Sequence, residues 1–127
     1  MVVHRDDLGH AVQQHGEKYG YGIVRDYTGH GIGRAMHEAP QIANYGRPGT
    51  KEKIRAGFVF ALEPMLNLGT HETKTLEDKW TVVTKDGKPS AHAEHTVAIT
   101  ADGPEILTLT KEQKAHLKMG KSEVVTA

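Results

Sequence analysis

The apolar segment at residues 58–62 (FVFAL) constrains the fold of this chain more than any other stretch. Side chains of an extended segment point alternately to opposite faces of a sheet. Glu63 follows directly, on the face shared by Val59 and Ala61. Pro64 comes next, and proline lacks the N–H group that a sheet ladder needs. The segment therefore predicts a strand that ends in a carboxylate.

Short segments with strand character occupy most of the rest of the chain. Further strands are expected at residues 21–28, 80–84, 91–100 and 105–109. Residues 80–84 and 91–100 flank the turn 85–88 (KDGK), which predicts a hairpin between them. The glycine-rich residues 29–33 are expected to form a turn, residues 41–50 a loop, and residues 52–55 one helical turn.

Helices are expected only near the two ends of the chain. Asp6 and Asp7 are plausible caps for a helix that runs to Lys18, and Thr110 for a helix that Gly120 closes. Because strands joined by short turns fill the middle, we expect an α+β fold with a largely antiparallel sheet. Residues 1–127 are expected to form a single domain.

Composition excludes several functional classes. The chain has 127 residues, and its 16 basic residues balance 16 acidic ones, which gives no argument for a nucleic-acid or anionic-membrane partner. The absence of cysteine excludes disulfides, thiol nucleophiles and cysteine-based zinc sites. No segment reads as a signal peptide or a membrane span, and the expected location is the cytoplasm.

The stretch at residues 27–40 (YTGHGIGRAMHEAP) combines glycines with two histidines. Its G-x-G-x-G spacing does not match the dinucleotide fingerprint, and no Gly-Lys-Ser/Thr follows for a phosphate loop. His30, between two glycines, lies on an uncrowded backbone and is well placed to reach into a cleft. Taken alone, the stretch favours a simpler interpretation, a strand-ending turn with a solvated histidine.

Two glutamates at strand positions change the balance. Glu63 ends an apolar strand, and alternation puts Glu94 on one strand face with His92 and Thr96. Taken singly, Glu94 is better explained as a strand residue that faces solvent, and Glu63 as the point where its strand leaves the core. Taken with His30, they supply one nitrogen and two carboxylates, which suit divalent Mn, Fe, Co or Zn. Carboxylates that bridge two such ions are typical of hydrolases.

The motifs of the chain resemble those of type I methionine aminopeptidases. They are GHGIGRAMHEAP (29–40), FALEPM (60–65), DKWTVVTKDGKPSAHAEHTVAIT (78–100) and GPEILT (103–108). The resemblance covers most of the chain, and its motifs are specific as a set. It implies half of a pita-bread fold and, for the complete family, removal of the initiator methionine from nascent proteins.

The same resemblance implies roles for individual residues. His30, Glu63 and Glu94 correspond to metal ligands, with Glu94 bridging two ions. His37 corresponds to a residue that contacts the substrate peptide and stabilises the transition state, and Glu63 also assists proton transfer. The residues that match positions near the bound methionine are Tyr27, Met36 and Trp80.

The sequence also departs from the family pattern. It corresponds to the C-terminal half of the family's catalytic domain, and the N-terminal half, with two aspartate ligands, has no counterpart in it. We therefore expect weak metal binding and little or no activity for the chain alone. We also expect a partner, either a second copy in a homodimer or a complementing N-terminal half. The alternatives are a non-catalytic binding module derived from the pita-bread fold and an engineered or truncated fragment.

Overall fold

The strand expected after Gly57 forms as predicted in the computed structural model, which describes residues 2–126. In chain order, the elements are α1 (Arg5–Lys18), β1 (Gly22–Ile23), β2 (Gly29–Gly31), β3 (Glu38–Ile42), β4 (Val59–Leu62), β5 (Met65–Asn67), β6 (Thr73–Thr75), β7 (Val82–Thr84), β8 (Ser90–His92), β9 (His95–Thr100), β10 (Gly103–Ile106) and α2 (Lys111–Thr126).

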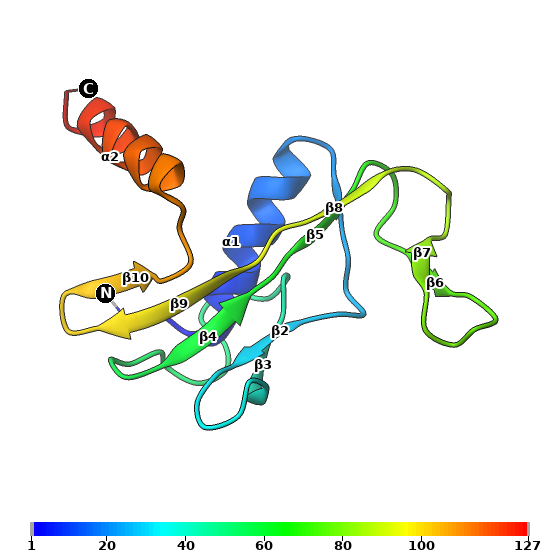
Figure 1. The fold of residues 1–127 in the computed structure, drawn as a ribbon, viewed down its shortest axis with the longest axis horizontal. Helices are drawn as coiled ribbons and strands as arrows, with labels where there is room; N and C mark the ends of the chain where they lie inside the picture. The colour runs from blue at the N-terminus through cyan, green and yellow to red at the C-terminus, as the bar shows by residue number, and fades with distance from the viewer. Residues whose placement is uncertain (1, 127) are drawn as a thin grey trace.

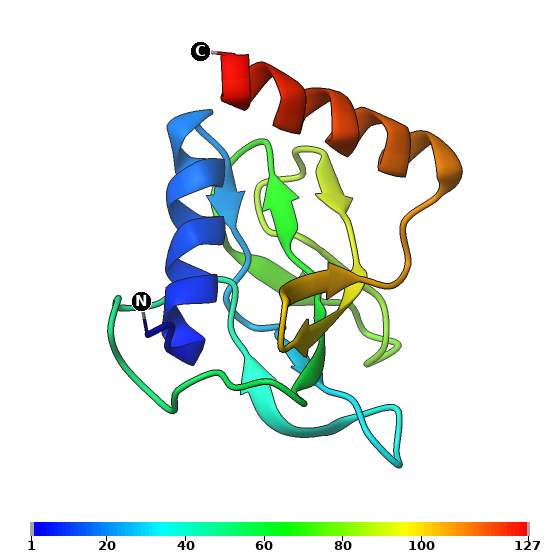
Figure 2. The same ribbon diagram turned by 90° about the vertical axis from the view of Figure 1, so that its left-hand side faces the viewer.

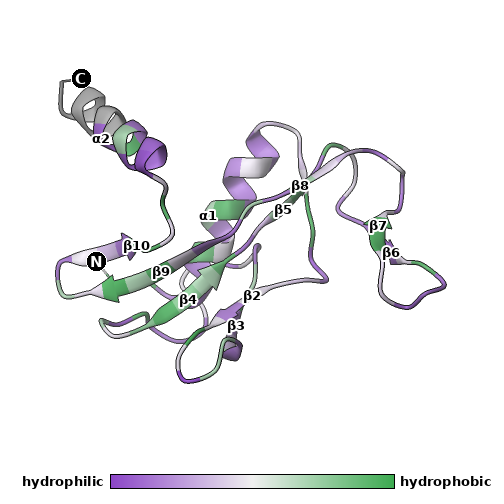
Figure 3. Ribbon diagram, viewed as in Figure 1, coloured by the Kyte–Doolittle hydropathy of each residue, from purple (hydrophilic) through white to green (hydrophobic). Residues whose placement is uncertain are grey.

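The strands form three antiparallel sheets. Five strands pair in the order β10-β9-β4-β2-β3, three in the order β1-β5-β8, and β6 pairs with β7. The β6–β7 hairpin projects from one end of the molecule (Figure 1), and hydrophobic residues concentrate along β4 and β9 (Figure 3). The α+β prediction with a largely antiparallel sheet is confirmed.

The core lies where α1 packs against β1 and β3. The buried apolar side chains are those of Ile23, Val24, Ile42, Phe60 and Ala61. Figure 2 shows α1 alongside the strands, whereas α2 lies across one end of the molecule. A Cβ atom at Gly9 would lie 2.6 Å from the carbonyl oxygen of Ala43, so only glycine lets this helix approach so closely.

The N-cap of α1 lies two residues before Asp6, the first of the expected caps. His4 is the N-cap, and Asp7 lies in the first turn. The Asp7 carboxylate accepts the backbone N–H groups of His4 at 2.6 Å and Gly49 at 2.7 Å, which lowers its pKa. The prediction that Asp6 caps the helix is therefore wrong: Asp6 instead accepts a hydrogen bond from the Thr50 hydroxyl at 2.8 Å.

The glycine-rich stretch is not a turn at its first three residues. Gly29–Gly31 form β2, an interior strand between β3 and β4. A Cβ atom at Gly29 would overlap the carbonyl oxygen of Ala61, and one at Gly31 would lie 2.5 Å from that of Ala39. These glycines are therefore needed because the neighbouring backbones lie close, and neither has a positive φ.

The predicted hairpin between residues 80–84 and 91–100 is also wrong. Strand β7 pairs with β6, and β8 pairs with β5. Residues 91–100 do not form one strand, because the pairing is interrupted between β8 and β9. The turn at Asp86 has another role: its carboxylate accepts the N–H groups of Thr70 at 2.9 Å and Lys88 at 3.0 Å, which lowers its pKa.

Other predicted boundaries shift. Only Gly22–Ile23 of residues 21–28 pair as a strand, β3 extends into the predicted loop as far as Ile42, and residues 52–55 form no helical turn. Thr110 caps α2 as predicted, because its hydroxyl accepts the Gln113 N–H at 3.1 Å. The helix runs past Gly120 to Thr126. Among residues 2–126, neither helix combines the length and hydrophobicity needed to cross a bilayer.

Candidate metal centre

The site lies where the chain passes between two sheets at two adjacent points, from β4 to β5 and from β8 to β9. Strand β4 belongs to the five-stranded sheet, and after Glu63 and Pro64 the chain continues as β5 in the three-stranded sheet. Strand β8 leaves the three-stranded sheet, and after Ala93 and Glu94 the chain continues as β9 beside β4. The Ala93 N–H donates to the Pro64 carbonyl at 3.2 Å and ties the two crossings together. Both glutamates therefore lie at the junction of the sheets.

His30 reaches the junction from the other side of β4. It is the middle residue of β2 and lies opposite Ala61 of β4. The register of β2 with β3 shifts between His30 and Gly31. A bulge of this kind re-aims a side chain, and bulges often occur beside active sites. The glycines on both sides leave room for the neighbouring strands, so His30 is the residue of this strand that carries a side chain.

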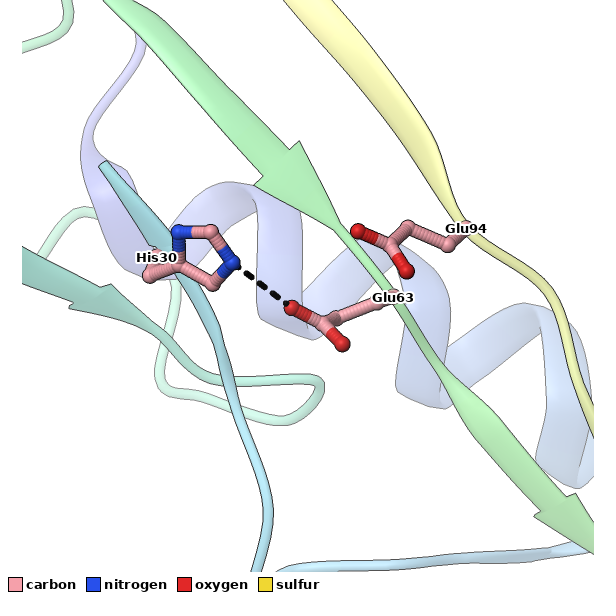
Figure 4. Close-up of side chains that lie close together, drawn as sticks. All are labelled: His30, Glu63 and Glu94. Atoms are coloured by element: carbon pink, nitrogen blue, oxygen red, sulfur yellow. Dashed lines mark ion pairs between the residues drawn. The ribbon is translucent and has the colours of Figure 1, made fainter. Parts of the chain in front are cut away.

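The three side chains converge. One ligand atom from each of His30, Glu63 and Glu94 lies within 4.8 Å of the others. Figure 4 shows the imidazole of His30 and both carboxylates directed toward one another. The side chains of His30 and Glu63 are 13% and 16% exposed, whereas Glu94 lies at the surface. The site is therefore half-buried, with an open side at Glu94.

The hydrogen bond of His30 defines which nitrogen faces the carboxylates. Its Nδ1 lies 2.9 Å from the Gly31 carbonyl oxygen, which can only accept, so Nδ1 carries a proton. In a neutral imidazole, Nε2 then has a lone pair, and it lies 3.2 Å from Oε1 of Glu63. A nitrogen lone pair and a carboxylate oxygen repel each other at this distance. A positive charge between them, either a proton on Nε2 or a bound cation, would remove the repulsion.

This donor set fits a divalent metal ion. A histidine whose Nδ1 is held by a carbonyl and whose Nε2 is free is the usual arrangement of a metal-binding imidazole. Two carboxylates beside it repel each other, and a dication would offset that repulsion. Nitrogen and oxygen donors together suit Mn, Fe, Co or Zn. The residues of the junction can therefore hold a metal ion, although their role as ligands stays a prediction.

His37 lies against His30, which the sequence did not indicate. Their ring centroids are 4.0 Å apart, with 34° between the ring planes. His37 is exposed and belongs to the segment between β2 and β3. A second imidazole is therefore beside the cluster, where it can contact a group bound to the site.

The other predicted substrate residues lie at the surface. Tyr27 lines an open groove together with Met65 and Val82. Met36 is 74% exposed and Trp80 86% exposed. The groove lined by Tyr27 includes neither Met36 nor Trp80, and the shared role of the three residues in binding substrate stays a prediction.

Sequence reasoning missed the contact of His92 with Glu63. Alternation along one continuous strand placed His92 and Glu94 on the same face, but the strand is interrupted between them. In the structure, Nε2 of His92 lies 3.6 Å from Oε2 of Glu63. Pro64 could have indicated the interruption. It has no N–H group for a sheet ladder, so the strand that contains Glu63 cannot continue regular pairing past this point.

Comparison with known proteins places this arrangement in a family. The sequence pattern of metallopeptidase family M24 matches residues 3–101. A methionine aminopeptidase from Clostridium perfringens is 57% identical over 105 residues, which are 83% of this chain and 42% of the relative. Methionine aminopeptidase 1 from Bacillus subtilis is 50% identical over 102 residues, 80% of this chain and 41% of the relative.

Solved structures agree with the sequence relatives. The crystal structure of methionine aminopeptidase from Rickettsia prowazekii superposes with a TM-score of 0.82 at 49% identity, over 85% of this chain and 44% of that chain. The structure from Thermotoga maritima gives a TM-score of 0.82 at 47% identity, over 86% and 44%. This chain therefore spans less than half the length of the relatives it matches.

Proposed function

Since this chain belongs to metallopeptidase family M24, we propose that it contributes the residues His30, Glu63 and Glu94 to the metal centre of a methionine aminopeptidase. The observation that carries the proposal is the convergence of the three side chains at the sheet junction. The chain is 57% identical to a protein named methionine aminopeptidase, which supports this activity over other peptidase activities.

The chain's own residues have distinct roles in this proposal. His30 would bind the divalent ion through Nε2. The Gly31 carbonyl, which accepts the Nδ1 proton, fixes the orientation of the ring. Bound there, a divalent ion would supply Lewis-acid chemistry suited to amide hydrolysis. Glu63, the more buried carboxylate, accepts and returns a proton during hydrolysis. Glu94, on the open side, would hold Mn, Fe, Co or Zn through its carboxylate, whose two oxygens would allow it to serve more than one ion.

We propose a peptide with an N-terminal methionine as substrate. In this proposal His37, whose ring lies against that of His30, donates a hydrogen bond to the peptide group beside the cluster. Tyr27, Met36 and Trp80 are the proposed contacts of the methionine side chain. A cytoplasmic location belongs to the same proposal, because new protein chains begin with methionine there.

A partner chain is part of the proposal. The accessible surface is 9254 Å², whereas a compact monomer of this mass has about 6,700 Å². The β6–β7 hairpin and α2 stand away from the rest of the molecule (Figure 1). The six residues of the interior strand β9 are all only half-buried, so a face of the five-stranded sheet is open. An interface of ordinary size would cover it.

The partner is either a second copy of this chain or a chain that resembles the remaining part of the relatives. Light scattering across a range of concentrations distinguishes the two, because a homodimer forms without added protein. In either case, the partner's role is to supply further metal donors and the rest of the substrate pocket.

Calorimetry with manganese tests the proposed metal centre. We expect wild-type protein to bind Mn²⁺ weakly and Glu94→Gln to bind it at least about 10-fold more weakly, because one anionic donor becomes neutral. Glu105→Gln is the matched control: Glu105 is an exposed glutamate on β10. Equal affinities for wild-type protein and Glu94→Gln would contradict the proposal.

Methionine release from a Met-Ala peptide with added Co²⁺ or Mn²⁺ is the second arm of the same test. We expect the chain alone to release little methionine, because His30, Glu63 and Glu94 leave most positions of a two-metal site without protein donors. Turnover well above that of His30→Ala would show that the chain is sufficient on its own.

A further inference from the structure

We infer that His92 is a positioning residue for the metal centre and orients the Glu63 carboxylate toward His30. This inference deepens the proposed function and rests on it. It concerns a residue outside the cluster of His30, Glu63 and Glu94.

Glu63 lies between two imidazoles. Its Oε1 faces Nε2 of His30 at 3.2 Å, and its Oε2 faces Nε2 of His92 at 3.6 Å. The last torsion of a glutamate side chain is broad, so nothing intrinsic to Glu63 keeps one oxygen toward the cluster. A partner on the second oxygen removes that freedom.

The backbone holds His92 in place against Glu63. His92 is the last residue of β8 and pairs with Met65, two residues after Glu63. The next residue, Ala93, donates its N–H to the Pro64 carbonyl at 3.2 Å. On the other side of Glu63, the amide of Asn44 lies 3.5 Å from the Glu63 carbonyl oxygen. The position of His92 relative to Glu63 therefore depends on neighbouring backbone contacts.

His92 lies outside the group of donors that surround a common point. Among the described residues, the ligand atoms within 4.8 Å of one another come from His30, Glu63 and Glu94. The His92 side chain is 43% exposed, whereas that of Glu63 is 16% exposed. His92 thus contacts the outer oxygen of Glu63, and its effect on a bound ion passes through that carboxylate.

Manganese affinity of position-92 variants tests the inference. We expect His92→Ala to bind Mn²⁺ about 10-fold more weakly than wild type, the lower end of the effect of residues that orient metal ligands. His92→Gln should recover most of the affinity, because its amide N–H can also approach Oε2 of Glu63. His15→Ala is the control, since His15 is an exposed histidine on α1 beside Tyr19.

A Co²⁺ spectrum separates positioning from direct coordination. If His92 acts through Glu63, the Co²⁺ absorption bands of His92→Gln match those of wild type once both are saturated. Bands that move in His92→Gln would make His92 a ligand and overturn the inference. Unchanged Mn²⁺ affinity in His92→Ala would overturn it as well.

A metal-free measurement keeps this inference distinct from the proposed function. In the absence of metal, we expect the δ-carbon NMR resonance of Glu63 to shift in His92→Ala and to stay in place in His15→Ala. If wild-type protein binds no Mn²⁺, the proposed metal centre fails. An unmoved Glu63 resonance in His92→Ala shows that His92 does not hold the carboxylate, whatever the metal result.

Discussion

The sheet junction and the β6–β7 hairpin both carry residues that the sequence assigned to the site, but they are built differently. At the junction, Phe60 is 4% exposed and Ala61 is fully buried, and each contact joins strands far apart in the chain. In the hairpin, Trp80 is 86% exposed, and the Asp78 carboxylate accepts N–H groups from Trp80 and Thr81. Long-range packing holds the first region, and local hydrogen bonds hold the second.

This difference separates the two kinds of site residue. Metal donors have to be held within a narrow geometry, so they belong on a packed scaffold such as β2 and the end of β4. Residues that contact a flexible peptide can lie on exposed segments, where contacts form on binding. His37 lies between these two cases: it is exposed, but its ring lies against that of His30 on β2.

The largest expected difference concerns loss of an aromatic side chain. Phe60→Ala should lower the free energy of unfolding by about 3–5 kcal/mol, because it leaves a cavity beside β2 and β9. Trp80→Ala should change it by no more than about 0.5 kcal/mol, because the ring is exposed. Urea denaturation followed by circular dichroism measures both. Similar losses in the two variants would break the comparison.

A smaller effect is expected from one added methyl group. Gly29→Ala should lower the free energy of unfolding by about 1–3 kcal/mol, because its Cβ would overlap the Ala61 carbonyl oxygen. Gly87 in the hairpin region has φ +74 and open space around it. Since asparagine tolerates that conformation, Gly87→Asn should cost about 0.5 kcal/mol or less. A larger loss in Gly87→Asn than in Gly29→Ala would reverse the ranking.

The smallest expected effect is a pH dependence confined to the hairpin. The Thr81 hydroxyl and the N–H groups of Trp80 and Thr81 donate to Asp78 and lower the pKa of its carboxyl group. A lowered pKa means that the carboxylate stabilises the folded hairpin above its unfolded pKa of about 3.9, and that this contribution is lost as pH falls through the folded value.

Fluorescence of Trp80, the only tryptophan, reports this change. We expect its emission to shift as the pH falls below about 4. Asp78→Asn should remove that step and leave the sheet junction unchanged. A step of equal size in Asp78→Asn would show that the acid transition belongs to other carboxylates.

Sequence reasoning succeeded where a local pattern decides the structure. The end of β4 at Leu62, directly before Glu63, follows from alternation and from Pro64, and the Thr110 cap follows from residue type. The convergence of His30, Glu63 and Glu94 was reached only by combining three separate motifs and a family resemblance. Their function as ligands stays a prediction.

The wrong hairpin and the missed contacts share one cause. Residues 80–84 and 91–100 both alternate, and a turn lies between them, yet β7 pairs with β6 and β8 pairs with β5. Alternation records which face a residue occupies, but it does not record which strand is its neighbour. The same limit hid the contact between His92 and Glu63 and the stacking of His37 on His30.

The sequence by itself determined the residue types, the strand that runs up to Glu63, and the Thr110 cap of α2. Such features depend on interactions among residues a few positions apart. Only the tertiary structure decided that β4 and β8 leave their sheets at one level, which brings Glu94 and His92 to Glu63. Pairing between distant strands depends on the packing of the whole chain, so no local pattern specifies it.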